Sequence, residues 1–136
     1  MSKINDKIDE VMEYLNKLLN KIPDTLEEYK SDDFMKAACE RYFEIIIEGI
    51  TDISFMIITQ KKFETPEDDI DSFRILADNK IIKEELYKKL SDAKGMRNFI
   101  AHQYGKINDK LVFEAIKEEL GKDAREFVES VKKHMK

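Results

Sequence analysis

The sequence contains few of the residues that cross-link or interrupt a chain: its 136 residues include one cysteine, two prolines, four glycines and no tryptophan. The single cysteine, Cys39, excludes an internal disulfide framework and a metal site built from several cysteines. The most apolar stretch, residues 45–59, carries two acidic residues and is too short to span a bilayer. The charged N-terminus shows no secretory signal, so we expect a cytoplasmic protein without membrane association that forms one domain over residues 1–136.

A strong positive charge is also absent. The net charge is −5, so the basic surface of proteins that bind nucleic acid without sequence preference is missing. The longest stretch without a carboxylate is Ala93–Asn108, and it contains Lys94, Arg97, His102 and Lys106. Such a neutral-to-basic window can bind one phosphate group without a basic surface elsewhere. Chance spacing of the acidic residues explains the same window equally well.

The remaining pattern is helical, because apolar residues recur at intervals of three and four rather than in alternation. We expect a first helix that ends at Pro23 and a long second helix that begins near the sequence SDDF and reaches about Gln60. A third helix is expected to start with Thr65 as its cap and Pro66 in its first turn. The later helices are expected over residues 83–104, ending at Gly105, and over residues 108–120 and 124–135, separated by Gly121.

Two apolar stripes predict which helix faces are buried. The first helix has a stripe of six residues: Ile4, Ile8, Val11, Leu15, Leu18 and Ile22. The second helix, expected at the centre of the bundle, has a longer one: Phe34, Ala38, Tyr42, Ile45, Gly49, Ile53 and Met56. These elements predict an all-α, up-and-down helical bundle of four main helices plus short extra helices.

A row of carboxylates repeats every four residues on the second helix: Glu40, Glu44, Glu48 and Asp52. Because a helix has 3.6 residues per turn, the row is expected to drift from the solvent side at Glu40 towards the apolar border at Asp52. A solvated face is the plain interpretation, and a metal site is disfavoured because only two histidines are present. At the border, Asp52 is an accessory candidate that holds Arg97 in place.

The stretch RNFIAHQY, residues 97–104, places an arginine, an asparagine, a histidine and a tyrosine at the end of the fourth expected helix. A histidine in the last turn of a helix can titrate near neutral pH, as general acid–base chemistry requires. Arg97 and His102 are five residues apart, a rotation of roughly 140°, so one chain does not bring both to one atom unless the helix end distorts. The structural alternative is a histidine that caps the helix beside an exposed arginine.

These four residues follow the pattern R-N-x-x-x-H-x-Y, which resembles the signature of HEPN domains and in particular of the HepT-like toxins. The resemblance covers roughly residues 3–135, including the long second helix at residues 36–58 and the segment at residues 71–104. It implies a HEPN-like helical bundle and a metal-independent ribonuclease toxin of a toxin–antitoxin pair, without a cofactor. Arg97 and His102 would be catalytic and Asn98 an accessory polar residue.

The resemblance also implies a partner and a modification. Tyr104 matches the tyrosine that the family's minimal nucleotidyltransferase antitoxins, encoded nearby, modify with AMP. Each AMP group would add negative charge and bulk beside the site and thereby block RNA.

A homodimer follows from the chemistry as well as from the resemblance. Attack by the 2′-hydroxyl of RNA, in a tRNA or an mRNA, needs a base, an acid and a cation, whereas one chain offers one well-placed arginine and one histidine. A two-fold axis through the site doubles both groups. The rival hypotheses are a non-catalytic HEPN module that binds a nucleotide or a partner, which the net acidity favours mildly, and a purely structural bundle.

Overall fold

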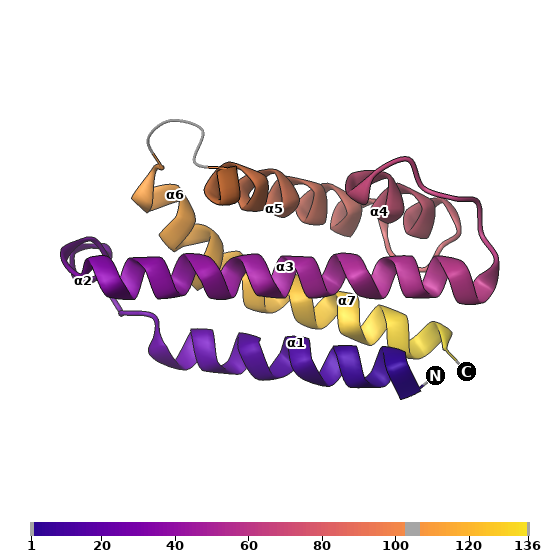
Figure 1. Cartoon of the computed structure of the whole chain (residues 1–136), viewed down its shortest axis with the longest axis horizontal. Coiled ribbons are helices and arrows are strands. Elements are labelled where there is room, and N and C mark those ends of the chain that lie inside the picture. Colours follow the sequence, from indigo (N-terminus) through magenta and orange to yellow (C-terminus); the bar gives the residue numbers. More distant parts are fainter. Residues whose placement is uncertain (1, 103–106, 136) are drawn as a thin grey trace.

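The computed structural model describes residues 2–102 and 107–135, and every regular element within these two ranges is a helix. The elements in chain order are α1 (Ser2–Lys21), α2 (Leu26–Ser31), α3 (Asp33–Lys61), α4 (Asp69–Asp78), α5 (Glu84–His102), α6 (Asp109–Glu114), the π-helix η1 (Ala115–Leu120) and α7 (Gly121–His134). The four long helices run up and down the bundle, and α3 lies between α1 and α5 (Figure 1). The expected all-α bundle of four main helices with short extra ones is confirmed.

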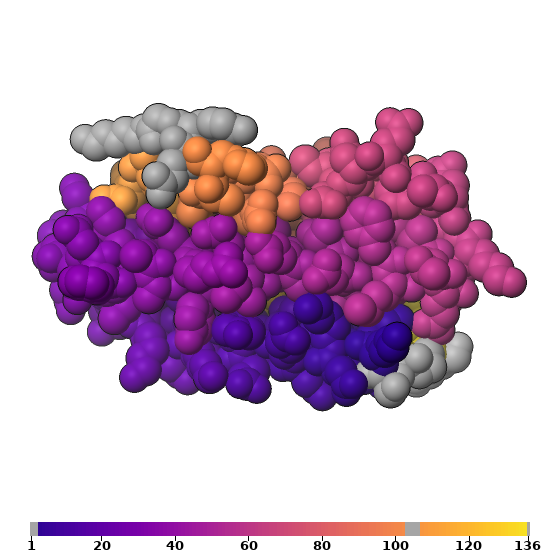
Figure 2. Space-filling view, in the orientation of Figure 1, coloured from indigo at the N-terminus to yellow at the C-terminus, as the bar shows by residue number. Residues whose placement is uncertain are grey.

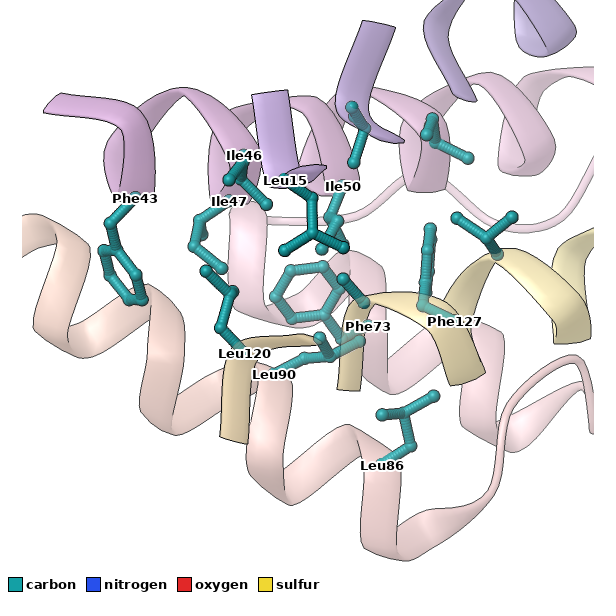
Figure 3. Close-up of a cluster of buried hydrophobic side chains, with 14 of the residues drawn as sticks. Leu15, Phe43, Ile46, Ile47, Ile50, Phe73, Leu86, Leu90, Leu120 and Phe127 are labelled. Carbon is teal, nitrogen blue, oxygen red and sulfur yellow. The ribbon is translucent and has the colours of Figure 1, made fainter. Parts of the chain in front are cut away.

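The core is one continuous cluster to which every long helix contributes. Figure 3 shows Leu15 from α1, Phe73 from α4 and Phe127 from α7 meeting a row of α3 side chains. Side chains of Leu86 and Leu90 close the cluster from α5. Burying such side chains is the main favourable contribution to folding, and it places one face of α3 against its neighbours.

Helix α1 buries the stripe that its sequence predicts. All six of its apolar positions are at most 6% exposed: Ile4, Ile8, Val11, Leu15, Leu18 and Ile22. Pro23 follows directly, after the last residue of the stripe. The i, i+3, i+4 spacing was sufficient here because one face of α1 carries nearly all of its large apolar residues.

Helix α3 buries a different face from the expected one in its first half. Phe34 is 91% exposed and Ala38 is also exposed, whereas Cys39 and Phe43 enter the core. From Gly49 onwards the expected positions return to the buried side, although Met56 remains partly exposed. The start of α3 has apolar residues on two sides, so the spacing alone did not show which side meets the neighbouring helices.

Helix α4 begins later than expected, because Asp68 rather than Thr65 is its N-cap. The Asp68 carboxylate accepts a hydrogen bond from the Asp71 backbone N–H at 2.7 Å, and the Asp71 carboxylate accepts one from the Glu67 backbone N–H at 2.9 Å. This reciprocal arrangement satisfies two backbone donors at the helix start. Pro66 therefore lies before the helix instead of in its first turn.

Gly121 does not separate two helices. Its backbone has helical angles, φ −60° and ψ −47°, and it joins η1 directly to α7. A Cβ atom at this position would lie 3.1 Å from Leu19 Cδ1 of α1 and 3.1 Å from Arg125 Nη1. The glycine therefore permits close packing of α7 on α1, and the expectation of a break at residue 121 was wrong.

Candidate functional site

The last two turns of α5 carry the polar residues of the RNFIAHQY stretch that the structure describes. Ile100 is 4% exposed and anchors this end of the helix in the core. Arg97 and Asn98 are half-buried, and His102 is exposed. Figure 2 shows this end of α5, in orange, at the surface directly beside the first half of α3, in purple. The polar groups are thus accessible from solvent but rest on a buried support.

The Arg97 guanidinium is held on two sides. Nη2 donates a short, charge-assisted hydrogen bond to Oε1 of Glu48 on α3, and Nη1 donates one to Oδ1 of Asn98 at 3.2 Å. These contacts use one N–H of each terminal nitrogen and leave the second N–H of each. The side chain is 20% exposed. Arg97 therefore has a fixed orientation with donor capacity remaining at the surface, which suits a phosphate or carboxylate ligand.

One donor of the same guanidinium is enclosed. Arg97 Nε is buried and, within the described part of the chain, has no hydrogen-bond partner. An unpaired buried donor costs free energy, and Tyr29, Ser91 and Asp123 also carry one such buried polar atom among the described residues.

The carboxylate that holds Arg97 is Glu48, one turn before the expected Asp52. Asp52 is 55% exposed at its side chain and pairs with Lys7 of α1 at 3.5 Å. Each step of four residues turns about 40° around the helix, which takes the row from the α5 side at Glu48 to the α1 side at Asp52. The expected direction of drift was wrong: Asp52 is the exposed end of the row and Glu40 is part-buried.

Burial affects the acidity of this row. Burial raises the pKa of the Glu40 carboxyl above its ordinary value, and nearby Lys36 opposes the shift. Lys36 itself bonds to Asp109 of α6 at 3.0 Å. Among residues 2–102 and 107–135, no three histidine, cysteine or acidic side chains gather as ligands for a metal ion.

The carboxylate-free window is not a basic patch in space. Lys94 is only 5% exposed, and its Nζ lies 2.9 Å from Oδ2 of Asp69 on α4. Arg97 is paired with Glu48 of α3. Carboxylates from two other helices therefore neutralise two of the window's cations, which a one-dimensional charge count cannot show. Lys106 lies outside the described residues.

Helix α5 is regular through His102, so Arg97 and His102 project roughly 140° apart around its axis. Asn98 and His102 are one turn apart, on the same face of the helix. The distortion that would let one chain converge arginine and histidine is not present up to His102. Tyr104, the expected site of modification, lies outside the described residues.

Sequence reasoning missed Glu48 as the partner of Arg97, although it included Glu48 in the acidic row. Helices α3 and α5 pack antiparallel, so the middle of α3 lies opposite the later turns of α5 (Figure 1). In an up-and-down bundle this arrangement indicates that Glu48, in the middle of α3, can reach Arg97. No helix among the described residues is long and apolar enough to cross a membrane.

The fold is a helical bundle, and the end of α5 carries a polar site. This site contains Arg97, which is paired with Glu48, and His102, which follows five residues later. The ribonuclease HepT-like family matches residues 4–131. Because this match spans most of the sequence, the chain belongs to that family.

Individual relatives agree with the family match. The chain is 26% identical to the tRNA nuclease HepT of Aphanizomenon flos-aquae over 83% of its own length and 77% of that protein. It is 27% identical to the mRNA nuclease HepT of Shewanella oneidensis, over 77% of its own length and 78% of that protein. A solved structure of a tri-AMPylated Shewanella oneidensis HEPN toxin in complex with MNT antitoxin has the same fold. Its TM-score is 0.91 at 24% identity, with 96% of this chain and 97% of that chain covered.

Proposed function

We propose that this protein is a metal-independent ribonuclease toxin that cleaves RNA at a site shared by two copies of the chain. The observation that carries the proposal is the Arg97 guanidinium, fixed by Glu48 and Asn98 with spare donors at the surface, five residues before the exposed His102. Membership of the ribonuclease HepT-like family supports the same chemistry. The relatives' names, a tRNA nuclease and an mRNA nuclease, support RNA as the substrate.

The proposed reaction is a transesterification within RNA. The 2′-hydroxyl of one nucleotide loses its proton to a base and forms a bond to the adjacent phosphorus. The bond from phosphorus to the 5′-oxygen of the next nucleotide breaks, and that oxygen receives a proton. The products are a 2′,3′-cyclic phosphate and a 5′-hydroxyl end. His102 transfers protons, and Arg97 stabilises the negative charge that develops on the phosphate oxygens.

The geometry of α5 supports a two-fold dimer. A helix that is regular through His102 directs the arginine and the histidine of one chain to different sides. Two motifs that face each other across a symmetry axis bring the arginine of one copy towards the histidine of the other. We therefore propose an isologous homodimer with Arg97 and His102 catalytic and Asn98 accessory.

The proposed partner is a minimal nucleotidyltransferase antitoxin that transfers AMP to Tyr104. The support is the solved complex of an AMPylated HEPN toxin with MNT antitoxin, whose fold this chain shares. AMP groups two residues after His102 would add negative charge and bulk beside the site and so oppose RNA binding. A cytoplasmic location, where RNA and the antitoxin are both present, is part of this proposal.

The test is cleavage of tRNA and mRNA by the purified protein in buffer containing EDTA. We expect the wild-type protein to cut RNA and to leave 2′,3′-cyclic phosphate ends. Arg97→Ala and His102→Ala are each expected to lower the rate by about 10³-fold, since they remove charge stabilisation or proton transfer. Arg125→Ala, on α7, and His134→Ala, the only other histidine, are matched controls that retain activity.

Specific results would contradict the proposal. Cleavage by Arg97→Ala or His102→Ala at the wild-type rate would exclude the assigned chemistry. Binding of RNA or nucleotide without any cleavage would favour the non-catalytic module. For the shared site, verified mixed dimers of wild type and His102→Ala should cut RNA much more slowly than wild-type dimers, because one histidine then has to serve as both base and acid. Half of the wild-type dimer rate or more in these mixed dimers would exclude sharing, since each chain would then act independently.

A further inference from the structure

Three carboxylates, one turn apart on α3, have three different partners. Glu44 lies 3.8 Å from Arg41 of the same helix, and Asp52 lies 3.5 Å from Lys7 of α1. Glu48, between them, is the one that reaches α5 and bonds to Arg97. Its role is therefore separable from that of its neighbours in the row.

The backbone beneath Glu48 is among the most tightly packed parts of the molecule. Ile47 and Ile50 are at most 1% exposed and point into the core (Figure 3). A Cβ atom on Gly49 would lie 2.4 Å from Val11 Cγ2, a distance that real contacts do not reach. Helices α1 and α3 thus approach each other closely at this turn, and the Glu48 carboxylate extends from a backbone that has little freedom to move.

The Glu48 contact restricts the arginine in a way that Asn98 alone does not. Asn98 is the neighbour of Arg97 on α5, so their 3.2 Å hydrogen bond moves with the helix and ties the guanidinium only to its own segment. Glu48 ties it to α3. A planar group held at both terminal nitrogens cannot rotate about its long side chain, and its two remaining N–H groups keep one direction.

We infer that Glu48 is a positioning residue for the proposed RNA cleavage: it orients the Arg97 guanidinium towards the scissile phosphate without touching RNA itself. This inference rests on the proposed function. Charge stabilisation in a transition state depends on donors that are already aligned, and a misplacement of about 1 Å can cost 10²-fold in rate. A carboxylate near a bound phosphate also repels it, so Glu48 contributes orientation at some cost in RNA affinity.

The test compares kcat and KM for RNA cleavage by Glu48→Ala, Glu48→Gln and the matched control Asp52→Asn. We expect kcat to fall by about 10²-fold in Glu48→Ala. In Glu48→Gln the amide still accepts a hydrogen bond, and we expect kcat to fall by about 10-fold. KM should stay unchanged or decrease in both, because one negative charge is lost. Asp52→Asn should retain the wild-type kcat and KM.

A structural role for Glu48 predicts a different result. If the contact only clamps α3 to α5, Glu48→Ala lowers the melting temperature and the active fraction, while kcat per active molecule is preserved. That outcome, or a rise in KM at constant kcat, would overturn the inference. Glu48→Gln keeps the shape of the side chain, so it supplies the answer if Glu48→Ala does not fold.

Wild type and Arg97→Ala, measured in the same assay, distinguish a failure of the proposed RNA cleavage from a failure of the role of Glu48. An inactive wild type, or an Arg97→Ala variant as fast as wild type, would overturn the proposed function and the role of Glu48 with it. The role of Glu48 alone would be overturned if wild type is active, Arg97→Ala is inactive and the kcat of Glu48→Ala lies within twofold of the wild-type value.

Discussion

Two cations of α5, Lys94 and Arg97, lie one turn apart and are both paired with a carboxylate from another helix, yet their surroundings differ. Lys94 is 5% exposed, and its ammonium lies 2.9 Å from Asp69 of α4. Arg97 has a side chain that is 20% exposed and bonds to Glu48 of α3 and to its neighbour Asn98. The Lys94 cation is enclosed by the fold although its Asp69 partner is 45% exposed, whereas the Arg97 cation itself is partly open to solvent.

The difference separates an ion pair whose cation is buried from one whose cation can take a further ligand. An ammonium is a compact charge, and the single Asp69 carboxylate at 2.9 Å largely compensates that of Lys94. A guanidinium has five N–H donors, and the contacts with Glu48 and Asn98 leave one N–H on each terminal nitrogen. A ligand can therefore add to Arg97 without breaking the existing pair, whereas it has no access to Lys94.

Among the variants that test the difference between Lys94 and Arg97, Arg97→Lys is expected to have the largest effect. A lysine keeps the positive charge but cannot bond to Glu48 and Asn98 and still present two aligned donors. We expect the rate of RNA cleavage to fall by about 10²-fold, as after loss of one charge-stabilising donor. The free energy of unfolding, measured by urea titration, should change by less than about 1 kcal/mol because the lysine keeps the positive charge beside Glu48. Full activity in this variant would show that charge alone suffices.

The Lys94–Asp69 pair should respond in the opposite way. Asp69→Ala leaves the buried Lys94 ammonium without its carboxylate, and we expect the free energy of unfolding to fall by about 2 kcal/mol, less than for a fully buried pair because the Asp69 side chain is 45% exposed. The cleavage rate per folded molecule should stay at the wild-type level. Lys94→Met is the matched control, since it removes the buried charge but keeps an apolar side chain of similar length, and it should cost much less. Equal losses in the two variants would show that the ion pair is not the source of the effect.

The fold was largely predictable because it depends on periodic patterns. The stripe on α1 identified every buried position, since the apolar residues of that helix lie on one side. The first half of α3 was misassigned because Phe34 and Cys39 lie on competing apolar sides. Gly121 was read as a break, although its small size serves the close contact with Leu19 of α1. Such errors arise where packing between helices determines whether a residue is buried or whether a glycine ends a helix.

For the site, the sequence predicted the spacing of residues within one helix but not their partners on other helices. The spacing of Arg97, Asn98 and His102 within α5 is a local property and could be read directly. The carboxylates that partner Arg97 and Lys94 come from α3 and α4, and their identity depends on how the helices pack. The choice of Asp52 over Glu48 was a rotation error of about 40°, which only the packed structure could correct. The shared site of a dimer and the role of Tyr104 stay predictions.

The smallest of these effects is expected at the start of α5, where a third ion pair is exposed. Arg74 of α4 donates two hydrogen bonds to the Glu84 carboxylate, one of them at 2.8 Å, and a third to Asp78 at 3.1 Å. The bonds from Arg74 lower the pKa of Glu84 below its ordinary value of 4.5. A lowered carboxyl pKa stabilises the folded state above the ordinary pKa, and this contribution is lost as the pH falls through the lowered value.

Glu84→Gln should therefore be slightly less stable than wild type at pH 7, and the difference should disappear as the pH falls below about 4.5. The effect should be well below that of Asp69→Ala, because Glu84 is 55% exposed at its side chain and solvent screens the pair. Melting temperatures measured from pH 3 to pH 7 would test both statements. A difference that does not shrink as the pH falls from 4.5 to 3 would contradict the assignment of this effect to the charge of Glu84.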